Sequence, residues 1–273
     1  MKYTIKDLRK DFPNDDVCLN YIFAKQYEKK CCTGQLYRVR GRKSYACSMC
    51  GKQVHPLKGT IFEKSSTPLT LWFHAIFLFA SSKNGVSAKE LQRQLGVTYK
   101  TAWRIGHQIR QLMEQGTDPL SGVVEVDETY YGKGGKNADK FKKKNVVFGM
   151  VERKGNVKAK IIKARTREAI IPELRNNIAR GSHIMTDEAH VYDRLGSVKL
   201  SRSKVKHGKK HWVYKNAHTN TIEGFWGQFK RSVRGTYHFI SSKHLQTYLD
   251  EFAFRYNLRA SSVPIFEILL GRV

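Results

Sequence analysis

The sequence has 273 residues, which is enough for more than one domain with a core of its own. Its 50 lysines and arginines against 23 aspartates and glutamates give a formal net charge of +27, a balance that suits a phosphate backbone. Aromatic residues make up 11% of the chain, and this content excludes a purely disordered basic tail. The polar beginning of the chain predicts no signal peptide, and its most apolar stretch, residues 69–80, is too short to cross a bilayer. We therefore expect a cytoplasmic protein that has no membrane partner.

Cysteines are confined to the first fifth of the chain, and they are Cys18, Cys31, Cys32, Cys47 and Cys50. Without a signal peptide, this clustering favours a metal site over disulfides. Cys47 and Cys50 form a CxxC motif followed by Gly51, which is half of a tetrahedral zinc site. Cys31 and Cys32 are adjacent, so they make an imperfect second pair, and His55 or Cys18 could supply a further ligand. The alternative is a ribbon that has lost its metal and keeps its cysteines as small apolar residues.

A helical segment is expected next. Thr67 before Pro68 predicts a capped helix start. The apolar face of this helix is predicted to consist of Leu71, Trp72, Ala75, Ile76 and Phe79.

Two shorter helices follow, joined by a turn at Gly96. Ser87 and Glu90 have the spacing of a capping box at the start of the first, and the second extends to Met113. Helix, glycine turn and helix predict a helix-turn-helix that binds DNA, although an ordinary helical hairpin would have the same pattern. The residues expected to contact DNA are Thr98, Tyr99, Lys100 and Arg104.

The pattern changes to strands after Gly116. In "GVVEVDETYYG", Val124 and Val126 alternate with polar residues that include Glu125 and Asp127. Two more strands, "NVVFGMVERKG" and "VKAKIIKA", are joined by a tight turn and predict a hairpin. A helix, a short strand ending at Asp187 and a late helix complete the order, which fits an α/β fold of the RNase H-like type with a mixed sheet.

Three acids in this region could hold divalent metal. Asp127 and Asp187 are each expected to end an apolar strand, and Glu223 lies on the late helix. Such a set can hold two Mg²⁺ or Mn²⁺ ions about 3.5–4 Å apart for attack on a phosphodiester. Glu125 is the strongest rival because it shares a face with Asp127, whereas Glu128 should point the other way. Other neighbouring acids are Glu188 and Asp193.

The motifs "VEVDETYYG", "MTDEAHVY" and "HTNTIEGFWGQFKRSVRGTYHFISSKHLQTYLDEFAFRYN" resemble those of DDE-type insertion-sequence transposases of the ISXO-like group. The resemblance implies a zinc-ribbon-like module over residues 1–62, a helix-turn-helix domain over 63–116 and an RNase H-like catalytic domain over 117–273. It also implies Asp127, Asp187 and Glu223 as the metal-binding triad, and it directs attention to Lys230 as a phosphate-holding catalytic residue.

Two departures from the family pattern bear on these expectations. The first zinc knuckle, normally CxxC, is here Cys31-Cys32-Thr33-Gly34. Some relatives carry asparagine or histidine in place of the third acid, which makes Asn220 a rival to Glu223. We prefer Glu223, because a carboxylate neutralises divalent charge and an amide only coordinates it.

Basic runs supply further candidate DNA contacts, at residues 139–145 and 199–215 and on the late helix. We expect contacts from Lys209, Lys210, Lys215 and Arg231. Trp212 and Tyr214 could stack on unpaired bases.

The expected function is a transposase that binds the terminal repeats of its element and catalyses metal-dependent cleavage and strand transfer. Its partner would be double-stranded DNA, both element ends and target, on which the protein would form a homo-oligomer associated with the nucleoid. The alternatives are a non-catalytic DNA-binding protein derived from such an enzyme, and an RNase H-like nuclease that cuts without joining.

Overall fold

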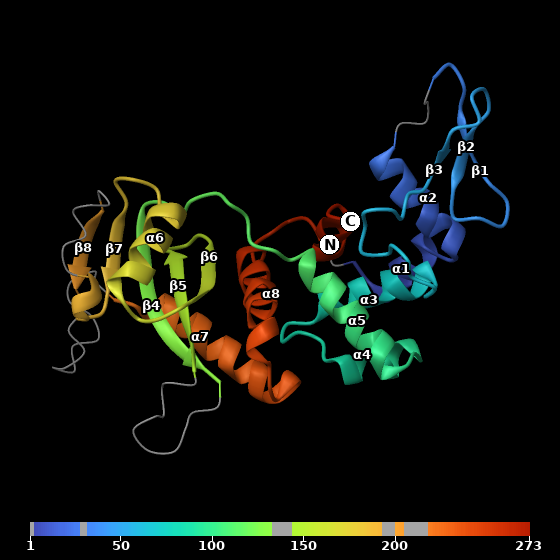
Figure 1. Cartoon of the computed structure of the whole chain (residues 1–273). Helices are drawn as coiled ribbons and strands as arrows, with labels where there is room; N and C mark the ends of the chain where they lie inside the picture. The colour runs from blue at the N-terminus through green and yellow to red at the C-terminus, as the bar shows by residue number, and fades with distance from the viewer. Residues whose placement is uncertain (1–2, 28–31, 133–143, 193–199, 205–217) are drawn as a thin grey trace. The chain divides into compact units, whose positions relative to one another are not determined.

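The computed structural model describes residues 3–27, 32–132, 144–192, 200–204 and 218–273, and the chain divides into two compact units (Figure 1). The first unit comprises residues 1–112 and 261–273, and the second comprises residues 113–260. The cysteine-rich and helical segments therefore belong to one unit, together with the last residues of the chain. Among the described residues, no helix has both the length and the apolar character to span a bilayer.

The first unit begins with two helices, α1 (Ile5–Asp11) and α2 (Asp15–Gln26), and a three-stranded antiparallel sheet. The strands are β1 (Leu36–Arg38), β2 (Tyr45–Cys47) and β3 (Gln53–Val54). The ring of Phe23 stacks on that of Tyr45 with their centroids 3.8 Å apart, so α2 packs directly on β2.

Four more helices complete this unit: α3 (Leu69–Ser81), α4 (Ala88–Leu95), α5 (Tyr99–Gln111) and α9 (Ile265–Leu270). The predicted apolar face of α3 is confirmed at Trp72, Ala75, Ile76 and Phe79, which are fully buried. The predicted cap is wrong. Pro68, not Thr67, occupies the N-cap position, and the helix start has no side-chain cap. The Thr67 hydroxyl instead accepts a hydrogen bond of 3.5 Å from Arg104.

The turn between α4 and α5 has the geometry expected from the sequence. The hydroxyl of Ser87 accepts a hydrogen bond from the Glu90 N–H, and Gly96 ends α4 with a φ of +65°. Thr98 caps α5 by accepting from the Thr101 N–H. Glycine suits the left-handed conformation at position 96 because it has no Cβ.

The second unit is built on a mixed five-stranded sheet of order β6-β5-β4-β7-β8, which confirms the predicted α/β class. The hairpin strands β4 (Val123–Tyr131), β5 (Asn145–Glu152) and β6 (Val157–Ile162) are antiparallel. Strands β7 (His183–Thr186) and β8 (Ser201–Lys204) extend the sheet in parallel from β4. Strand β8 was not expected, since its sequence "SRSK" has no apolar alternation, but charged residues are usual on an edge strand.

Helices cover both faces of this sheet (Figure 1). On one face, α6 (Arg167–Asn177) and the short helix η2 (His190–Tyr192) pack on side chains that include Val124 and Val126. On the other, α7 (Asn220–Ser232) and α8 (Leu245–Asn257) pack on Val147, Val151 and Ala159. Between α7 and α8 run a π-helical turn, η5 (Val233–Tyr237), and a 3-10 turn, η6 (Ser242–His244). The predicted alternation of faces in β4 is thereby confirmed.

Gly149 allows α7 to approach the sheet closely. It pairs with Asp127 across β4 and β5, and a Cβ at this position would lie 2.3 Å from the ring of Trp226 on α7. The helix that carries Glu223 is therefore packed against the very register position that holds Asp127.

Candidate active site

Asp127 and Asp187 lie beside each other by strand register. Strands β4 and β7 pair in parallel, with Glu125 opposite Met185, so two further residues bring Asp187 alongside Asp127. Neighbouring strands are about 4.8 Å apart. Asp187 follows the end of β7, as predicted, but Asp127 lies within β4 and not at its end. The reason is that residues 128–131 continue to pair with β5 after β7 has stopped.

The carboxyl of Asp127 lies in an environment that disfavours its charge. Burial is the main cause that raises its pKa to about 7, followed by the charge of Glu128 and then those of Asp187 and Glu223. Asp187 and Glu223 thus lie close enough to Asp127 for their charges to repel its own. A divalent cation would offset this repulsion, so the residues present fit the hard metal ion expected from the sequence.

Asp187 is held by cationic and backbone donors. Its Oδ1 accepts from the Ala189 N–H at 3.0 Å, and its Oδ2 accepts from Arg165 at 2.9 Å. Arg202 on β8 donates to the backbone carbonyl of Asp187 at 3.0 Å. Sequence analysis identified neither arginine, since each stands among other basic residues without a motif.

Glu128 points to the opposite face from Asp127, as predicted. It accepts a hydrogen bond of 2.6 Å from the hydroxyl of Tyr192, whose ring is buried in the core beneath α6. Its other oxygen lies 3.4 Å from the Nε of Arg165, which therefore bridges Glu128 and Asp187. Of the remaining acids considered, Glu188 is exposed and Asp193 lies outside the described residues.

Glu223 is exposed in the first turn of α7, and one of its oxygens accepts from the Thr219 hydroxyl at 2.8 Å. Its charge contributes to the raised pKa of Asp127. Asn220, the rival third residue, is exposed at the first position of the same helix. Lys230 is exposed two turns further along and lines a cavity beside β4.

Glu125, the strongest rival of Asp127, holds the start of α7 against β4. It is fully buried and accepts hydrogen bonds from the backbone N–H groups of Thr221 at 2.8 Å and Ile222 at 3.2 Å. Arg153 pairs with it at 2.9 Å, and His218 Nδ1 lies 3.2 Å away. Glu125 thus caps the helix that carries Glu223 from within the strand that carries Asp127. It is a positioning residue.

The cysteine cluster is the most compact group of potential ligands. Among the described residues, Cys32, Cys47 and Cys50 form the one group of three or more whose ligand atoms all lie within 4.8 Å of one another. Cys32 Sγ and Cys47 Sγ are 3.5 Å apart, close to the roughly 3.8 Å between thiolates on a tetrahedral zinc with bonds of about 2.3 Å.

Backbone groups support two of these sulfurs. Gly34 donates its N–H to Cys32 Sγ at 3.3 Å, and Met49 donates to Cys47 Sγ at 3.5 Å. Of the other predicted ligands, Cys31 lies outside the described residues, and His55 is exposed and not part of the cluster. Cys18 is buried within α2, and burial followed by the charge of Asp15 raises its pKa to about 12. Cys18 is a core residue.

Only some of the residues predicted to contact DNA are described and exposed. On α5, Tyr99 and Lys100 are exposed, but Arg104 donates to the Ser65 hydroxyl at 3.0 Å and is turned toward α3. Trp103 is 41% exposed and was missed, although its spacing of four residues from Tyr99 places both on one helical face. Arg231 is exposed on α7, whereas Lys209, Lys210 and Lys215 lie outside the described residues, as do Trp212 and Tyr214.

The segment that contains these acids matches a known protein family. Residues 119–257 match the ISXO2-like transposase domain. The chain belongs to this family of transposases. The matched segment contains Asp127, Asp187, Glu223 and Lys230, and it excludes the cysteine cluster.

Two individual proteins are similar to this member of the ISXO2-like family. One is an uncharacterized protein in transposable element ISH50 of Halobacterium salinarum, 27% identical over 239 residues that cover 80% of this chain and 79% of the relative. The other is a chain in the solved structure of a simian T-cell lymphotropic virus intasome in complex with a PP2A regulatory subunit. It is 17% identical with a TM-score of 0.34, and the match covers 66% of this chain and 65% of that one.

Proposed function

We propose that the chain is a DNA transposase that cleaves the ends of its element and joins them to target DNA. In this proposal residues 113–260 form an RNase H-like catalytic domain, in which Asp127, Asp187 and Glu223 bind Mg²⁺ or Mn²⁺. The observation that supports the proposal most directly is the parallel register of β4 and β7, which brings Asp187 alongside Asp127, and the charge of Glu223 on α7 also reaches Asp127. Membership of a transposase family supports the same conclusion.

The protein groups have separable tasks in this reaction. Asp127, Asp187 and Glu223 would hold the metal ions as deprotonated carboxylates, and metal binding would release the proton of Asp127 to solvent. Bound metal supplies Lewis acidity for in-line attack by water or a DNA 3′-hydroxyl and for departure of the leaving oxygen. Lys230 holds a neighbouring phosphate as a point charge. Glu125 keeps α7 at the distance from β4 that lets Glu223 face Asp127.

We further propose that the first unit recognises the terminal repeats and binds structural zinc. The α4–α5 pair would be a helix-turn-helix with Tyr99, Lys100 and Trp103 on its exposed face. Cys32, Cys47 and Cys50 would supply three zinc ligands. In this proposal, the boundaries predicted at residues 62 and 116 separate the zinc-binding, DNA-recognising and catalytic modules.

Both element ends need an active site, so we propose that the protein acts as a homo-oligomer on double-stranded DNA in the nucleoid. The overall charge of +27 supports this partner. The non-catalytic reading has less support, since all three acids are present and Asp127 lies alongside Asp187 by strand register. A nuclease that cuts without joining is the remaining alternative.

The test is a strand-transfer assay with pre-cleaved element-end DNA and Mg²⁺, comparing wild type with Glu223→Gln and Asn220→Asp. We expect joined product from wild type and Asn220→Asp but not from Glu223→Gln, with equal DNA binding by all three. Equal joining by Glu223→Gln would remove Glu223 from the site and favour Asn220. Binding without joining or cleavage by the wild type would favour the non-catalytic reading, and cleavage without joining would favour the nuclease.

A further inference from the structure

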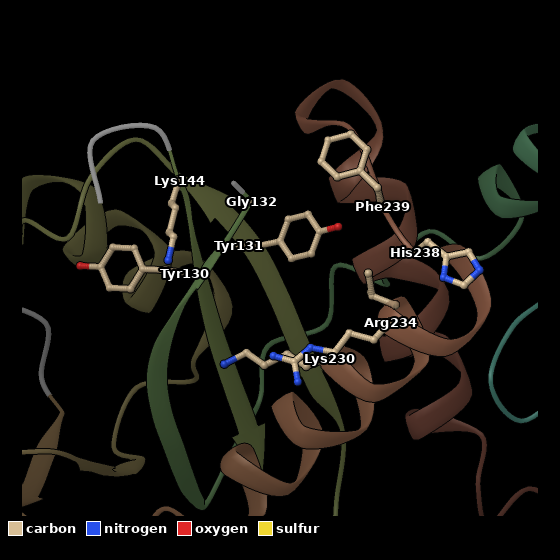
Figure 2. Close-up of a pocket in the computed structure, with 9 residues that line it drawn as sticks. Tyr130, Tyr131, Gly132, Lys144, Lys230, Arg234, His238 and Phe239 are labelled. Atoms are coloured by element: carbon tan, nitrogen blue, oxygen red, sulfur yellow. The ribbon is translucent and has the colours of Figure 1, made fainter. Parts of the chain in front are cut away.

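We propose that a cavity beside the catalytic acids is a pocket for one unpaired deoxynucleotide at the end of the bound DNA strand. The cavity has a volume of about 450 Å³ and lies between β4 and the end of α7 (Figure 2). This inference rests on the proposed function, because that function supplies the DNA end. The cavity is lined by Tyr130, Tyr131, Gly132, Lys144, Lys230, Val233, Arg234, His238 and Phe239.

The positively charged residues around the cavity suit a phosphate group. Lys230 and Arg234 are four residues apart on the continuous α7–η5 helix, so they project from the same side, and Lys144, just before β5, is a third cation of the lining (Figure 2). No acid is among the described residues that line this cavity. Cations gathered along one cavity suit the phosphate backbone of a nucleic acid.

The aromatic residues select a base. Tyr130 and Tyr131 come from β4, and Phe239 stands at the mouth with 56% of its surface exposed. An exposed phenyl ring beside cations is the combination that binds unpaired nucleotides, since the ring stacks on the base and the cations hold its phosphate. A base inside a duplex has both faces covered by neighbouring base pairs, so a ring that enters a pocket with the base favours a nucleotide that has left the duplex.

The backbone around Phe239 is held in a strained conformation. His238 has a φ of +60° and a ψ of −44°, and the Phe239 N–H donates across it to the Tyr237 carbonyl at 2.6 Å. This is the geometry of a γ-turn, which is rare and costly for a residue other than glycine. It directly follows the π-helical turn η5, another feature that is frequent at functional sites.

Two hydrogen bonds fix this strained segment to the sheet. The Ile240 N–H donates to the Tyr131 hydroxyl at 2.9 Å, and Asn145 donates its side-chain N–H to the Ser242 hydroxyl at 2.8 Å. Phe239 is therefore presented at the cavity mouth by a rigid turn, and its exposure is not that of a loose surface residue. Such preorganisation lowers the entropic cost of binding.

The pocket lies at a suitable distance from the acids. Lys230 follows Glu223 by seven residues, which is about 10 Å along a helix. Tyr131 follows Asp127 by four residues, which is about 13 Å along a strand. Since the rise per nucleotide on a DNA strand is about 3.4 Å, a strand cleaved at the acids would reach the pocket a few nucleotides away.

Fluorescence anisotropy without added Mg²⁺ or Mn²⁺ would test the pocket without catalysis. The probes are a blunt duplex and the same duplex carrying three unpaired nucleotides at its 5′ or its 3′ end. We expect wild type to prefer one tailed probe, and Phe239→Ala to weaken tailed binding by about 5- to 150-fold while leaving blunt binding unchanged. Phe239→Trp should keep the preference, and Arg234→Ala should reduce the salt dependence of tailed binding by about 0.7 in log–log slope.

Tyr37→Ala is the matched control, because Tyr37 is also an exposed aromatic, with 55% of its surface accessible, and lies in the other unit. It should leave the ratio of tailed to blunt binding unchanged. Equal wild-type binding to all probes, or an equal effect of Phe239→Ala on blunt and tailed DNA, would overturn the proposal. No effect of Phe239→Ala on the binding of tailed DNA would also overturn it.

Asp127→Asn separates this inference from the proposed function. The variant should retain the tail preference of wild type even though it joins no DNA. If wild type prefers the tailed probe but never joins DNA, the transposase proposal is contradicted and the pocket remains supported. If wild type joins DNA but binds tailed and blunt probes equally, the pocket is contradicted and the transposase proposal remains supported.

Discussion

The cysteine cluster and the carboxylate site are two candidate metal centres assembled to different degrees. Three sulfur atoms lie within 4.8 Å of one another, whereas the three acids form no such compact group among the described residues. Thiols that remain protonated can be packed together at little electrostatic cost. Carboxylates repel one another, and Asp187 is paired with Arg165 instead. The difference teaches that thiol ligands for a soft ion can be packed together before the metal binds. Carboxylate ligands for a hard ion come together fully only when the positive charge of the metal offsets their repulsion.

The largest expected effect would come from Asp127→Asn. The change leaves the shape of the site intact but removes a charged metal ligand, so strand transfer should fall by roughly 1,000-fold, equivalent to about 4 kcal/mol. The measurement is the rate of strand transfer at saturating Mg²⁺, with Glu188→Gln as the control because Glu188 is an exposed neighbouring acid. A variant that retained a tenth of the wild-type rate would remove Asp127 from the reaction.

Glu125→Ala should test whether the two acids on the same face of β4 have different tasks. The change removes a buried acceptor of two helix N–H groups and the partner of Arg153, so the free energy of unfolding should fall by about 3 kcal/mol. Urea unfolding measures this, and Glu223→Gln on the exposed side of α7 should change stability by less than about 0.5 kcal/mol. Equal stability of both variants would contradict the assignment of Glu125 as the positioning residue.

Gly34→Ala should weaken the cysteine cluster without removing any sulfur. A Cβ at this position would lie 2.7 Å from Cys47 Sγ, and the Gly34 N–H that supports Cys32 would have to move. Zinc affinity, measured by competition with a chromogenic chelator, should fall by about 10- to 100-fold. Gly116→Ala is the control because a Cβ there meets nothing. Unchanged affinity would mean that the cluster tolerates a wider arrangement than its geometry indicates.

The smallest effect concerns the raised pKa of Asp127, of which burial is the main cause and the neighbouring acids a further one. Because the folded pKa of Asp127 is raised to about 7 from 3.8, the folded state binds more protons than the unfolded state between these values. The stability of metal-free protein should therefore decline as pH rises from about 4 to 7. Asp127→Asn lacks this contribution, so without added Mg²⁺ or Mn²⁺ it should become more stable than wild type near pH 8, by an amount of order 1 kcal/mol. A pH profile parallel to that of wild type would show that the pKa of Asp127 is not raised.

Patterned features could be predicted from the sequence, and features that depend on single contacts could not. Alternation placed Val124 and Asp127 on opposite faces of β4, and Gly96 marked the turn between α4 and α5, because both follow from local backbone geometry. Strand β8 was missed because an edge strand that pairs on one side needs no apolar pattern. Arg165 was missed because it is defined only by Glu128 and Asp187, which the fold brings to it from distant parts of the chain.

The continuation of β4 past Asp127 explains another error. The sequence predicted that this acid would end an apolar strand. Pairing of residues 128–131 with β5 depends on the partner strand, which no local pattern reveals. The same extension carries Tyr130 and Tyr131 to the cavity.

A single helix carries both Glu223 and Lys230, and this has a consequence for how the protein can change over evolutionary time. Inserting or deleting one residue between them would rotate one relative to the other by about 100° around the helix axis. Either Glu223 would turn away from Asp127, or Lys230 would leave the cavity. The residues between them can be exchanged for others, but their number is fixed, so variation in length within this family should be absent from this segment of α7.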